Sequence, residues 1–553
     1  MVATHYRWDF VGLSTDDKPT ADNPKVTNGS TFYESDTSKY YIWYNDQWYE
    51  KVANGGGSTE PTSSETRITS FDNTTKTITG SGFGEQGDNS KVYLLLREYN
   101  DYAFLDVASW KDNEIKLTEP IDLSAIEGTT SIHVVTNDDI WSNKILVEGT
   151  TPVEGYGKLY IQERPNAPVT IVELTSNSDI NKLSGTAQYS KSFTIGSDKY
   201  FRDEVVGIQL GSDYTATNTP ATFLAYCTNL NQPVVFPDTV TSIYYEFMIN
   251  CKGFNSIVVV NEATSIGNSF MKDCVSFNQP LNFEDATTIG DDFLYECFSF
   301  NSPLTIDDAT TIGSNFLGYD YRFNQDLSLT KVSSLGSYFL RECHSFDSKL
   351  SNFATTLTTL PTYFIYRCYS FNQPLDLSQV TSFGDYFMYG DYSFNSQIMF
   401  NDDVTTLGNY FLADCYSFND SYVTIPLSSA TTIGNYVLKG CHSFNNQITL
   451  SNAVTIGTYF MSSCYSMNST ISIVSSSLES IGGYFLNLSY AFNNLYTETN
   501  VSPTDAYSLS SNTSDIRAYT DGITVEGSGA TSWCTNLPNS SRTNYRKLIN
   551  GTV

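Results

Sequence analysis

The sequence is poor in charge for its length, and most of the charge that it has is negative. Charged residues make up 16% of the 553 residues, and 60 acidic residues stand against 30 Lys and Arg, which gives a formal net charge of −30. A chain of this sign repels nucleic-acid phosphates, and no cluster of Lys and Arg supplies a local basic patch. We therefore expect no nucleic-acid partner.

Long apolar runs are also missing. No stretch of 18 apolar residues occurs, so neither a transmembrane helix nor membrane insertion is expected. The opening MVATHYRWDFVGLSTDD lacks the apolar segment of a signal peptide, and the final RKLINGTV carries no sorting or lipidation signal. The sequence thus predicts a protein made soluble inside a cell, which a route other than secretion must release if it acts outside.

Catalytic and metal-binding motifs are scarce as well. The chain has no nucleophile elbow, Walker loop or HExxH motif, and only four His, of which His344 and His442 fall in a repeat column otherwise filled by aromatic residues. Acidic pairs such as Glu284-Asp285 could flank a glycosidic bond in a depolymerase or bridge calcium between coils, although solvated turns explain them more simply. We expect no enzyme, no cofactor and no metal site.

What the sequence does contain is a long repeat. Units of 23 to 26 residues follow one another from about Ala221 to Asn494, for example EDATTIGDDFLYECFSFNSPLTI followed by DDATTIGSNFLGYDYRFNQDLSL. Such a period predicts a solenoid, here of roughly eleven or twelve units. Alternating apolar pairs such as Leu281 and Phe283 predict one short strand per unit, stacked into a parallel sheet.

Single repeat columns carry further predictions. A Gly column that includes Gly290 and Gly434 predicts a tight turn, and Phe-Leu pairs with a Phe column predict the core. An Asn column that includes Asn301 predicts side-chain amides that satisfy turn backbone from coil to coil. Nine of the ten cysteines share one column, which favours buried free thiols over disulfides or metal ligands. These cysteines are Cys227, Cys251, Cys274, Cys297, Cys343, Cys368, Cys415, Cys441 and Cys464.

Two tyrosine-rich columns form the candidate ligand-binding surface. Repeated rings could stack on sugar faces of a cell-wall or capsular polysaccharide, or contact a protein, whereas padding between coils is the simpler explanation for any single ring. The first column holds Tyr338, Tyr363, Tyr386, Tyr410, Tyr436, Tyr459 and Tyr484, and the second holds Phe298, Tyr321, Tyr369, Tyr392, Tyr416, Tyr465 and Tyr490.

The start of the chain differs from the repeats. The alternation in KYYIWYNDQWYEKV predicts a hairpin that turns near Asn45-Asp46, and NGGGSTEPTSSET predicts a flexible tether. We expect the aromatic module to anchor the protein through Trp8, Phe10, Trp43 and Trp48. The expected parts are 1–52 (anchoring module), 53–66 (linker), 67–150 (β-sandwich), 151–220 (β-rich cap or adaptor), 221–494 (solenoid) and 495–553 (C-terminal cap).

The repeat resembles the leucine-rich repeats of BspA-like bacterial surface proteins and of related mycoplasma-type proteins. The resemblance rests on the TSIG-type turn, the Phe-Leu pair, the Cys that follows and the SFNQPL strand. It implies a mainly β, leucine-rich-repeat-type solenoid that serves as an adhesive scaffold. The chain departs from the pattern at Asp320, Asp391 and Ser489, which stand where Cys is expected, and it has FL or FM in place of the usual AF.

Two shorter segments before the repeats also resemble known modules. The segment ITGSGFG and the strands after it resemble an immunoglobulin-like TIG (IPT) domain, which implies a spacer. The opening HYRWDFVGLSTDDKPT, with NGSTFYESDTSKYYIWYNDQWYEK, is similar to N-terminal modules of gut-phage virion fibre proteins.

Together the resemblances predict a bacteriophage head or tail fibre, located in the virion. It docks on capsid or tail proteins through its N-terminus, binds bacterial surface or mucosal glycans or proteins through the solenoid, and is a possible homo-oligomer. A bacterial BspA-like cell-surface adhesin is the alternative, and a polysaccharide depolymerase comes third.

Overall fold

The computed structural model describes most of the chain and divides it into two compact units, Met1–Thr62 and Ser63–Val553. The described residues are 9–12, 18, 31–34, 39–44, 47–51, 66–137, 140, 142–185, 191–419, 425–489, 491–492, 494–503 and 524–529.

The first unit contains one four-stranded sheet in chain order, β1-β2-β3-β4. Strands β3 and β4 are antiparallel, with Trp43 opposite Trp48 in the register, which confirms the predicted hairpin. Phe10 lies in β1, whereas Trp8 and the turn at Asn45-Asp46 lie outside the described residues. The strands are β1 Asp9–Gly12, β2 Thr31–Glu34, β3 Lys39–Tyr44 and β4 Gln47–Lys51.

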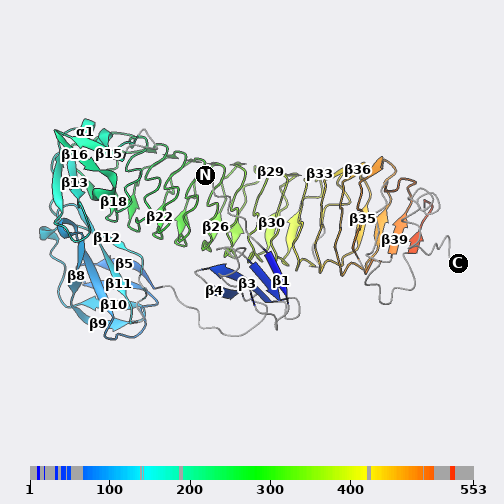
Figure 1. The fold of residues 1–553 in the computed structure, drawn as a ribbon, viewed down its shortest axis with the longest axis horizontal. Coiled ribbons are helices and arrows are strands. Elements are labelled where there is room, and N and C mark those ends of the chain that lie inside the picture. The colour runs from blue at the N-terminus through cyan, green and yellow to red at the C-terminus, as the bar shows by residue number, and fades with distance from the viewer. Residues whose placement is uncertain are drawn as a thin grey trace. The chain divides into compact units, whose positions relative to one another are not determined.

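The second unit begins with two four-stranded antiparallel sheets, β5-β6-β10-β9 and β12-β11-β7-β8 (Figure 1). Both contribute to one hydrophobic core that includes Ile78, Phe83, Val92, Ile115 and Ile132. The strands are β5 Arg67–Asp72, β6 Thr77–Ser81, β7 Lys91–Leu96, β8 Asp101–Leu105, β9 Val107–Lys111, β10 Glu114–Leu117, β11 Thr129–Val135 and β12 Ile145–Glu148. The 3₁₀ helices are η1 Arg97–Tyr99 and η2 Leu123–Ala125.

A small α+β segment connects these sheets to the solenoid. Its buried residues Leu159, Ile180 and Phe193 belong to the same hydrophobic cluster as Phe223 in the first coil, so the segment covers the first end of the solenoid core. Its elements are β13 Gly157–Ile161, β14 Thr170–Leu174, α1 Asn177–Lys182, β15 Ser192–Ile195, β16 Asp198–Phe201, η3 Arg202–Glu204 and β17 Val205–Leu210.

The repeats form a leucine-rich-repeat-type β-solenoid of about 11 turns, as the period predicts. Within the described residues, strands follow the Phe-Asn pairs as predicted and pair in parallel, for example Leu281 with Leu304, whereas the segment after Phe418-Asn419 lies outside the described residues. The strands of this set are β18 Val234–Val235, β20 Val258–Val259, β22 Leu281–Asn282, β24 Leu304–Thr305, β26 Leu327–Ser328, β28 Leu350–Ser351, β30 Leu375–Leu377, β32 Ile398–Phe400, β35 Ile448–Leu450, β37 Ile471–Ile473, β39 Asn494–Thr497 and β40 Thr524–Glu526. The last strand of the set, at residues 524–526, lies beyond the predicted repeats.

A second set of parallel strands lies just before the Gly column, where the sequence predicts only a turn. Each strand is two residues long, with an outward Ser or Thr and an inward apolar residue, as in Thr432 and Ile433. The set comprises β19 Ser242–Ile243, β21 Ser265–Ile266, β23 Thr288–Ile289, β25 Thr311–Ile312, β27 Ser334–Leu335, β29 Thr359–Leu360, β31 Ser382–Phe383, β33 Thr406–Leu407, β34 Thr432–Ile433, β36 Thr455–Ile456 and β38 Ser480–Ile481.

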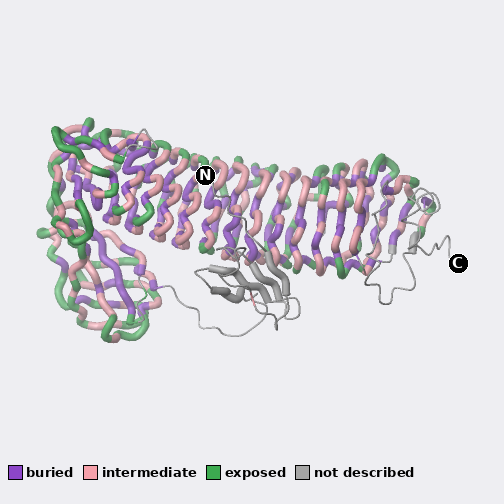
Figure 2. The backbone as a smooth tube through the Cα atoms, viewed as in Figure 1, coloured by how far each residue is buried: buried purple, intermediate pink, exposed green. Residues whose placement is uncertain are grey.

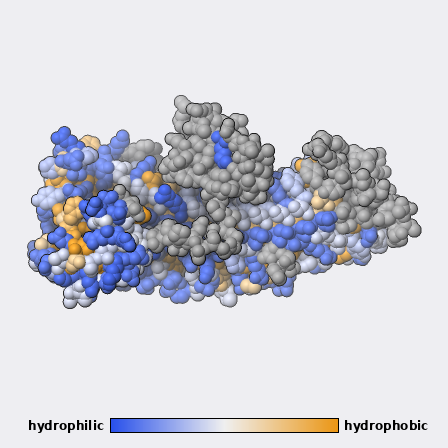
Figure 3. Space-filling model, turned by 90° about the horizontal axis from the view of Figure 1, so that it is seen from below, coloured by the Kyte–Doolittle hydropathy of each residue, from blue (hydrophilic) through white to orange (hydrophobic). Residues whose placement is uncertain are grey.

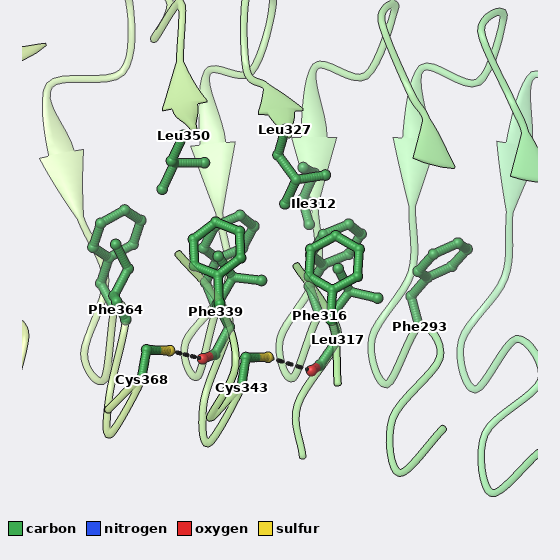
Figure 4. Packing of buried hydrophobic residues seen from close by; sticks show 14 of the residues in the cluster. Phe293, Ile312, Phe316, Leu317, Leu327, Phe339, Cys343, Leu350, Phe364 and Cys368 are labelled. Atoms are coloured by element: carbon green, nitrogen blue, oxygen red, sulfur yellow. Dashed lines mark hydrogen bonds between the residues drawn. The ribbon is translucent and has the colours of Figure 1, made fainter. Parts of the chain in front are cut away.

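The solenoid core is built from columns of stacked rings. Phe293, Phe316 and Phe339 follow one another with ring centroids 5.4 and 5.3 Å apart (Figure 4), and their side chains are fully buried. A second column continues from Phe277 to Phe300 at 5.7 Å. The buried sides of all coils therefore join into one continuous interior (Figure 2).

The nine cysteines of the column are buried free thiols, as expected, but those from Cys251 to Cys464 are also hydrogen-bond donors. The Cys368 Sγ donates to the Leu340 carbonyl oxygen of the preceding coil at 2.9 Å (Figure 4). Ser489, which replaces Cys in the last coil, donates in the same way to the Met461 carbonyl oxygen at 2.7 Å. At most positions the column therefore holds a small donor and not simply a small apolar group, whereas Asp391 accepts a bond from the Cys368 N–H.

The Gly and Asn columns serve the contact between coils. A Cβ on Gly434 would lie 2.7 Å from the Gly408 backbone, and the repeat-column glycines are not among the residues with positive φ. Close approach of coils, and not a left-handed turn, is thus the reason for glycine. In the Asn column the Asn324 N–H donates to the Asn301 Oδ1 at 2.8 Å, which confirms the predicted coil-to-coil amide bonds.

Candidate functional site

Seven tyrosines of the first predicted column form a continuous stack, which we call the Tyr338 ladder. Each tyrosine lies four residues after the first residue of one of the short strands that precede the Gly column. The seven rings therefore occupy equivalent positions in successive coils. Neighbouring planes are within 12° of parallel, and successive centroids are 4.5, 4.4, 4.3, 4.3, 4.8 and 4.2 Å apart. The members are Tyr338, Tyr363, Tyr386, Tyr410, Tyr436, Tyr459 and Tyr484.

The backbone of the ladder is held in an uncommon conformation. All seven tyrosines have φ between 58° and 65°, a left-handed region that costs non-glycine residues roughly 1–2 kcal/mol each. Hydrogen bonds to the following coil support it, since the Tyr410 N–H donates to the Asn435 carbonyl oxygen at 2.7 Å. In the first five coils the same position holds Thr222, Glu246, Ser269, Asp292 and Asn315, so the ladder occupies only the later coils.

The second predicted column forms a parallel stack, the Phe298 ladder. Its centroids are 5.2, 4.7, 4.5, 4.9, 4.5, 4.4 and 4.4 Å apart, and His344 and His442 take the place of tyrosine as stacking rings. The members are Phe298, Tyr321, His344, Tyr369, Tyr392, Tyr416, His442 and Tyr465. Tyr490, which the sequence places next, lies outside the described residues.

Stacking decides what these rings can contact. Inside a ladder, the neighbouring rings cover both faces of each ring, so an interior ring cannot stack on a sugar face. Only the ring edges and the hydroxyls of interior rings remain available for contact with a ligand. Tyr369 is only 1% exposed, which removes it from the surface that a ligand can reach. Tyr465 at 42% is the most exposed ring of its ladder. The ligand-binding role of the other predicted tyrosines stays a prediction.

Two ladder hydroxyls, those of Tyr363 and Tyr410, hold their protons more tightly than a free phenol does. Partial burial raises the pKa of Tyr363, and the neighbouring hydroxyls of Tyr386 and Tyr338 add to the rise. The same causes raise the pKa of Tyr410. A row of neutral hydroxyls can both donate and accept hydrogen bonds.

A charged cluster that the sequence analysis missed lies between the ladders. The Glu342 carboxylate accepts from His344 Nε2 at 3.0 Å and pairs with the Arg367 guanidinium at 3.4 Å. Arg341 lies over the rings of Tyr319 and Tyr338, 4.7 and 5.0 Å from their centroids. No column pattern marks this cluster, because its members occupy positions that change identity from coil to coil.

The acidic pairs are dispersed along the coils. Asp308 forms an ion pair with Lys331, and Asp292 pairs with Lys272 at 2.8 Å. No group of three or more His, Cys, Asp or Glu that could hold a metal ion occurs within the part of the chain that the structure describes. Within the same part, no helix is long and apolar enough to cross a bilayer. The visible surface of the coils is mostly hydrophilic (Figure 3).

Comparisons with known proteins match the repeats. Residues 217–346 and 416–537 match the family of BspA type leucine-rich repeat regions, in six copies. Residues 305–398 match a family described as a mycoplasma protein of unknown function. The second BspA-type range passes residue 494, where the sequence predicted the repeats to end, and β39 and β40 likewise continue the sheet of β35 and β37.

Two solved structures resemble the chain at low identity. A leucine-rich repeat protein from Bacteroides ovatus has a TM-score of 0.43 and 15% identity, and the match covers 71% of this chain and 98% of that one. A leucine-rich cell surface protein from Faecalibacterium prausnitzii has a TM-score of 0.29 and 16% identity, with 60% and 96% covered. No curated protein matches the sequence. On the family match and the solenoid together, the repeats of this chain are leucine-rich repeats of the BspA type.

Proposed function

We propose that the protein is a non-enzymatic adhesin of a bacterial cell surface, which binds glycans or proteins of a neighbouring surface through the solenoid. The observation that carries the proposal is the Tyr338 ladder, which aligns seven ring edges and hydroxyls over consecutive coils. Tyrosine gives a large amphipathic contact at low conformational-entropy cost. Equal repetition along a rigid scaffold lets weak contacts add up.

The BspA-type repeats favour the cell-surface adhesin over the virion fibre. Location in the virion, and docking on capsid or tail through Trp8, Phe10, Trp43 and Trp48, stay predictions. A depolymerase is disfavoured because the acidic pairs take part in structural contacts, such as that of Asp308 with Lys331.

The sandwich suits the role of a spacer that is fixed to the solenoid. Arg97 is 8% exposed, and its guanidinium donates to the carbonyl oxygens of Thr129, Ile208 and Pro233 at 2.6, 3.1 and 3.2 Å. In return, Gln232 Nε2 donates to the Arg97 carbonyl oxygen at 2.9 Å. A buried arginine that bonds to both the sandwich and the first coils supports a rigid junction. The resemblance of the sandwich to a TIG domain stays a prediction.

Adhesion of the full chain to bacterial cells and to mucin-coated surfaces tests the proposal. The triple variant Tyr386→Ser, Tyr410→Ser, Tyr436→Ser should lose most of the adhesion. Tyr244→Ser with Tyr245→Ser is the matched control, because these tyrosines are 46% and 53% exposed but lie outside both ladders.

Thermal unfolding and circular dichroism show whether the ladder variant is folded. If it is not, the milder triple Tyr→Phe variant at the same positions tests the hydroxyls alone. A folded ladder variant that adheres as well as the control would refute the proposal. Release of reducing sugar from capsular polysaccharide would instead support the depolymerase.

A further inference from the structure

A row of outward hydroxyls runs beside the Tyr338 ladder. We call it the hydroxyl row, and each member is the first residue of a short parallel strand, followed by an inward apolar residue. Five of its seven side chains are exposed and two are half-buried. Strand pairing places Thr432 beside Thr455, at the spacing of about 4.8 Å between neighbouring strands. The members are Ser334, Thr359, Ser382, Thr406, Thr432, Thr455 and Ser480.

These hydroxyls differ from those one residue earlier. The Thr431 Oγ1 donates to the Thr405 carbonyl oxygen at 3.0 Å, and Thr381 donates to Thr358 at 3.4 Å, so the earlier column holds the coils together. None of the hydrogen bonds among the described residues uses a hydroxyl of the hydroxyl row. Their donor and acceptor capacity is therefore directed to the outside.

The strip between the hydroxyl row and the Tyr338 ladder is almost uncharged. Two residue columns form this strip. One is the Gly column, and the other is the column that follows it, which holds small polar residues and one acid, Asp385. The Asp385 carboxylate is already bonded to the N–H and Nδ2 of Asn409, at 2.7 and 3.1 Å. In earlier coils the corresponding strip carries Asp291 and Asp292. Beside the ladder, the strip thus carries one acid over seven coils, whereas the earlier coils carry three, Glu246, Asp291 and Asp292.

We propose that the strip from the hydroxyl row to the Tyr338 ladder, within residues 334–484, binds a neutral linear polysaccharide laid along the solenoid axis. Six hydroxyls, from Thr359 to Ser480, lie on neighbouring strands of one sheet. Together with the tyrosine hydroxyls on the other side of the strip, they match a polymer that repeats its own hydroxyls. A polyanionic glycan would be repelled by the acidic chain. This inference rests on the proposed adhesion function and names the ligand class for the same surface.

Equal spacing makes the binding depend on ligand length. A polymer that spans several coils gains each further contact at high effective concentration, whereas a short oligosaccharide engages one or two coils. The plain alternative is that Ser and Thr stand in this row because β-branched and small polar residues suit exposed strands. That alternative predicts no effect of the hydroxyls on binding.

The test uses the full chain in affinity gel electrophoresis against hydroxyethyl cellulose, galactomannan and dextran, with hyaluronan as the polyanion. The variant Thr406→Val, Thr432→Val, Thr455→Val removes three hydroxyls and keeps the β-branched shape. Since each lost hydrogen bond costs about 0.5–1.5 kcal/mol, affinity for the bound neutral polymer should fall about tenfold or more. The control Thr288→Val with Thr311→Val, in coils without ladder tyrosines, should bind normally.

The possible outcomes separate this inference from the proposed function. Binding of none of the neutral polymers, together with adhesion that still depends on the ladder, overturns the inference and leaves the adhesin proposal standing. Equal binding by both Val variants, with equal melting temperatures, shows that the strip is not the site. Preference for hyaluronan also overturns it. If the wild-type chain neither adheres to cells nor binds any of the polymers, both proposals are refuted.

Discussion

The Cys343 thiol donates a hydrogen bond to the Leu317 carbonyl oxygen, with sulfur and oxygen 3.0 Å apart. Both groups are fully buried, and the bond joins two consecutive coils. Burial also raises the pKa of the Cys343 thiol, which keeps the proton on sulfur. The bond between coils at Cys343 therefore depends on a donor at this position. We expect substitutions of Cys343 to affect stability according to whether the new side chain supplies a donor.

Cys343→Ser should unfold at nearly the same denaturant concentration as the wild-type protein, because serine keeps the donor. Cys343→Val leaves the Leu317 carbonyl oxygen without its partner and should cost about 1–3 kcal/mol. Chemical denaturation followed by circular dichroism measures both. Equal losses for Ser and Val would show that packing alone governs the column.

Asp391 should make the stability of the solenoid depend on pH. Its side chain is fully buried in the Cys column, its Oδ1 accepts from the Cys368 N–H at 2.7 Å, and burial raises its pKa well above the usual value. Because the folded pKa exceeds that of the unfolded chain, about 3.9, the acid form favours folding at low pH. That contribution is lost as the pH rises through the folded pKa.

Asp391→Ser should therefore be more stable than the wild type at neutral pH, with the gain shrinking toward pH 4. Thermal unfolding between pH 4 and 8 measures the difference. Asp308→Ser, at an ion pair on the surface, is the control for removal of an acidic side chain that is not buried in the core. A gain for Asp391→Ser that did not vary with pH would point to packing instead of ionisation.

Gly434→Ala should lower the stability by about 1–3 kcal/mol, because the added methyl group meets the Gly408 backbone at 2.7 Å. The exposed Ser428→Ala in the same region is the control and should be nearly neutral. Urea unfolding of the two variants compares them directly. A neutral Gly434→Ala would mean that the coils separate at little cost.

Asn301→Ala should cost about 1–3 kcal/mol, since the Asn324 N–H would lose its acceptor. Asn301→Asp should be tolerated better, because Asp347 fills the same column and accepts from the Asn372 N–H at 2.8 Å. Melting temperatures of the two variants test the order. The reverse order would imply that the amide donor matters more than the carbonyl acceptor.

The features of the fold that follow from the repeat period were predicted correctly from the sequence. A period near 23 residues places Phe293, Phe316 and Phe339 at the same point of successive coils, so stacking in a common core follows from the period alone. The free thiols and the bonds of the Asn column were predictable for the same reason. The end of the repeats was harder to place, because the regular spacing of the columns is lost after residue 494.

Tertiary structure alone decided how the columns meet. The sequence places Tyr386 and Tyr410 in one column but does not say that their rings lie 4.3 Å apart with covered faces, which changes the mode of contact from ring faces to edges and hydroxyls. It also marks Gly434 without showing that the reason is the adjacent backbone. Repeat spacing fixes which residues are equivalent, whereas the distance between coils fixes which of their atoms remain free to bind.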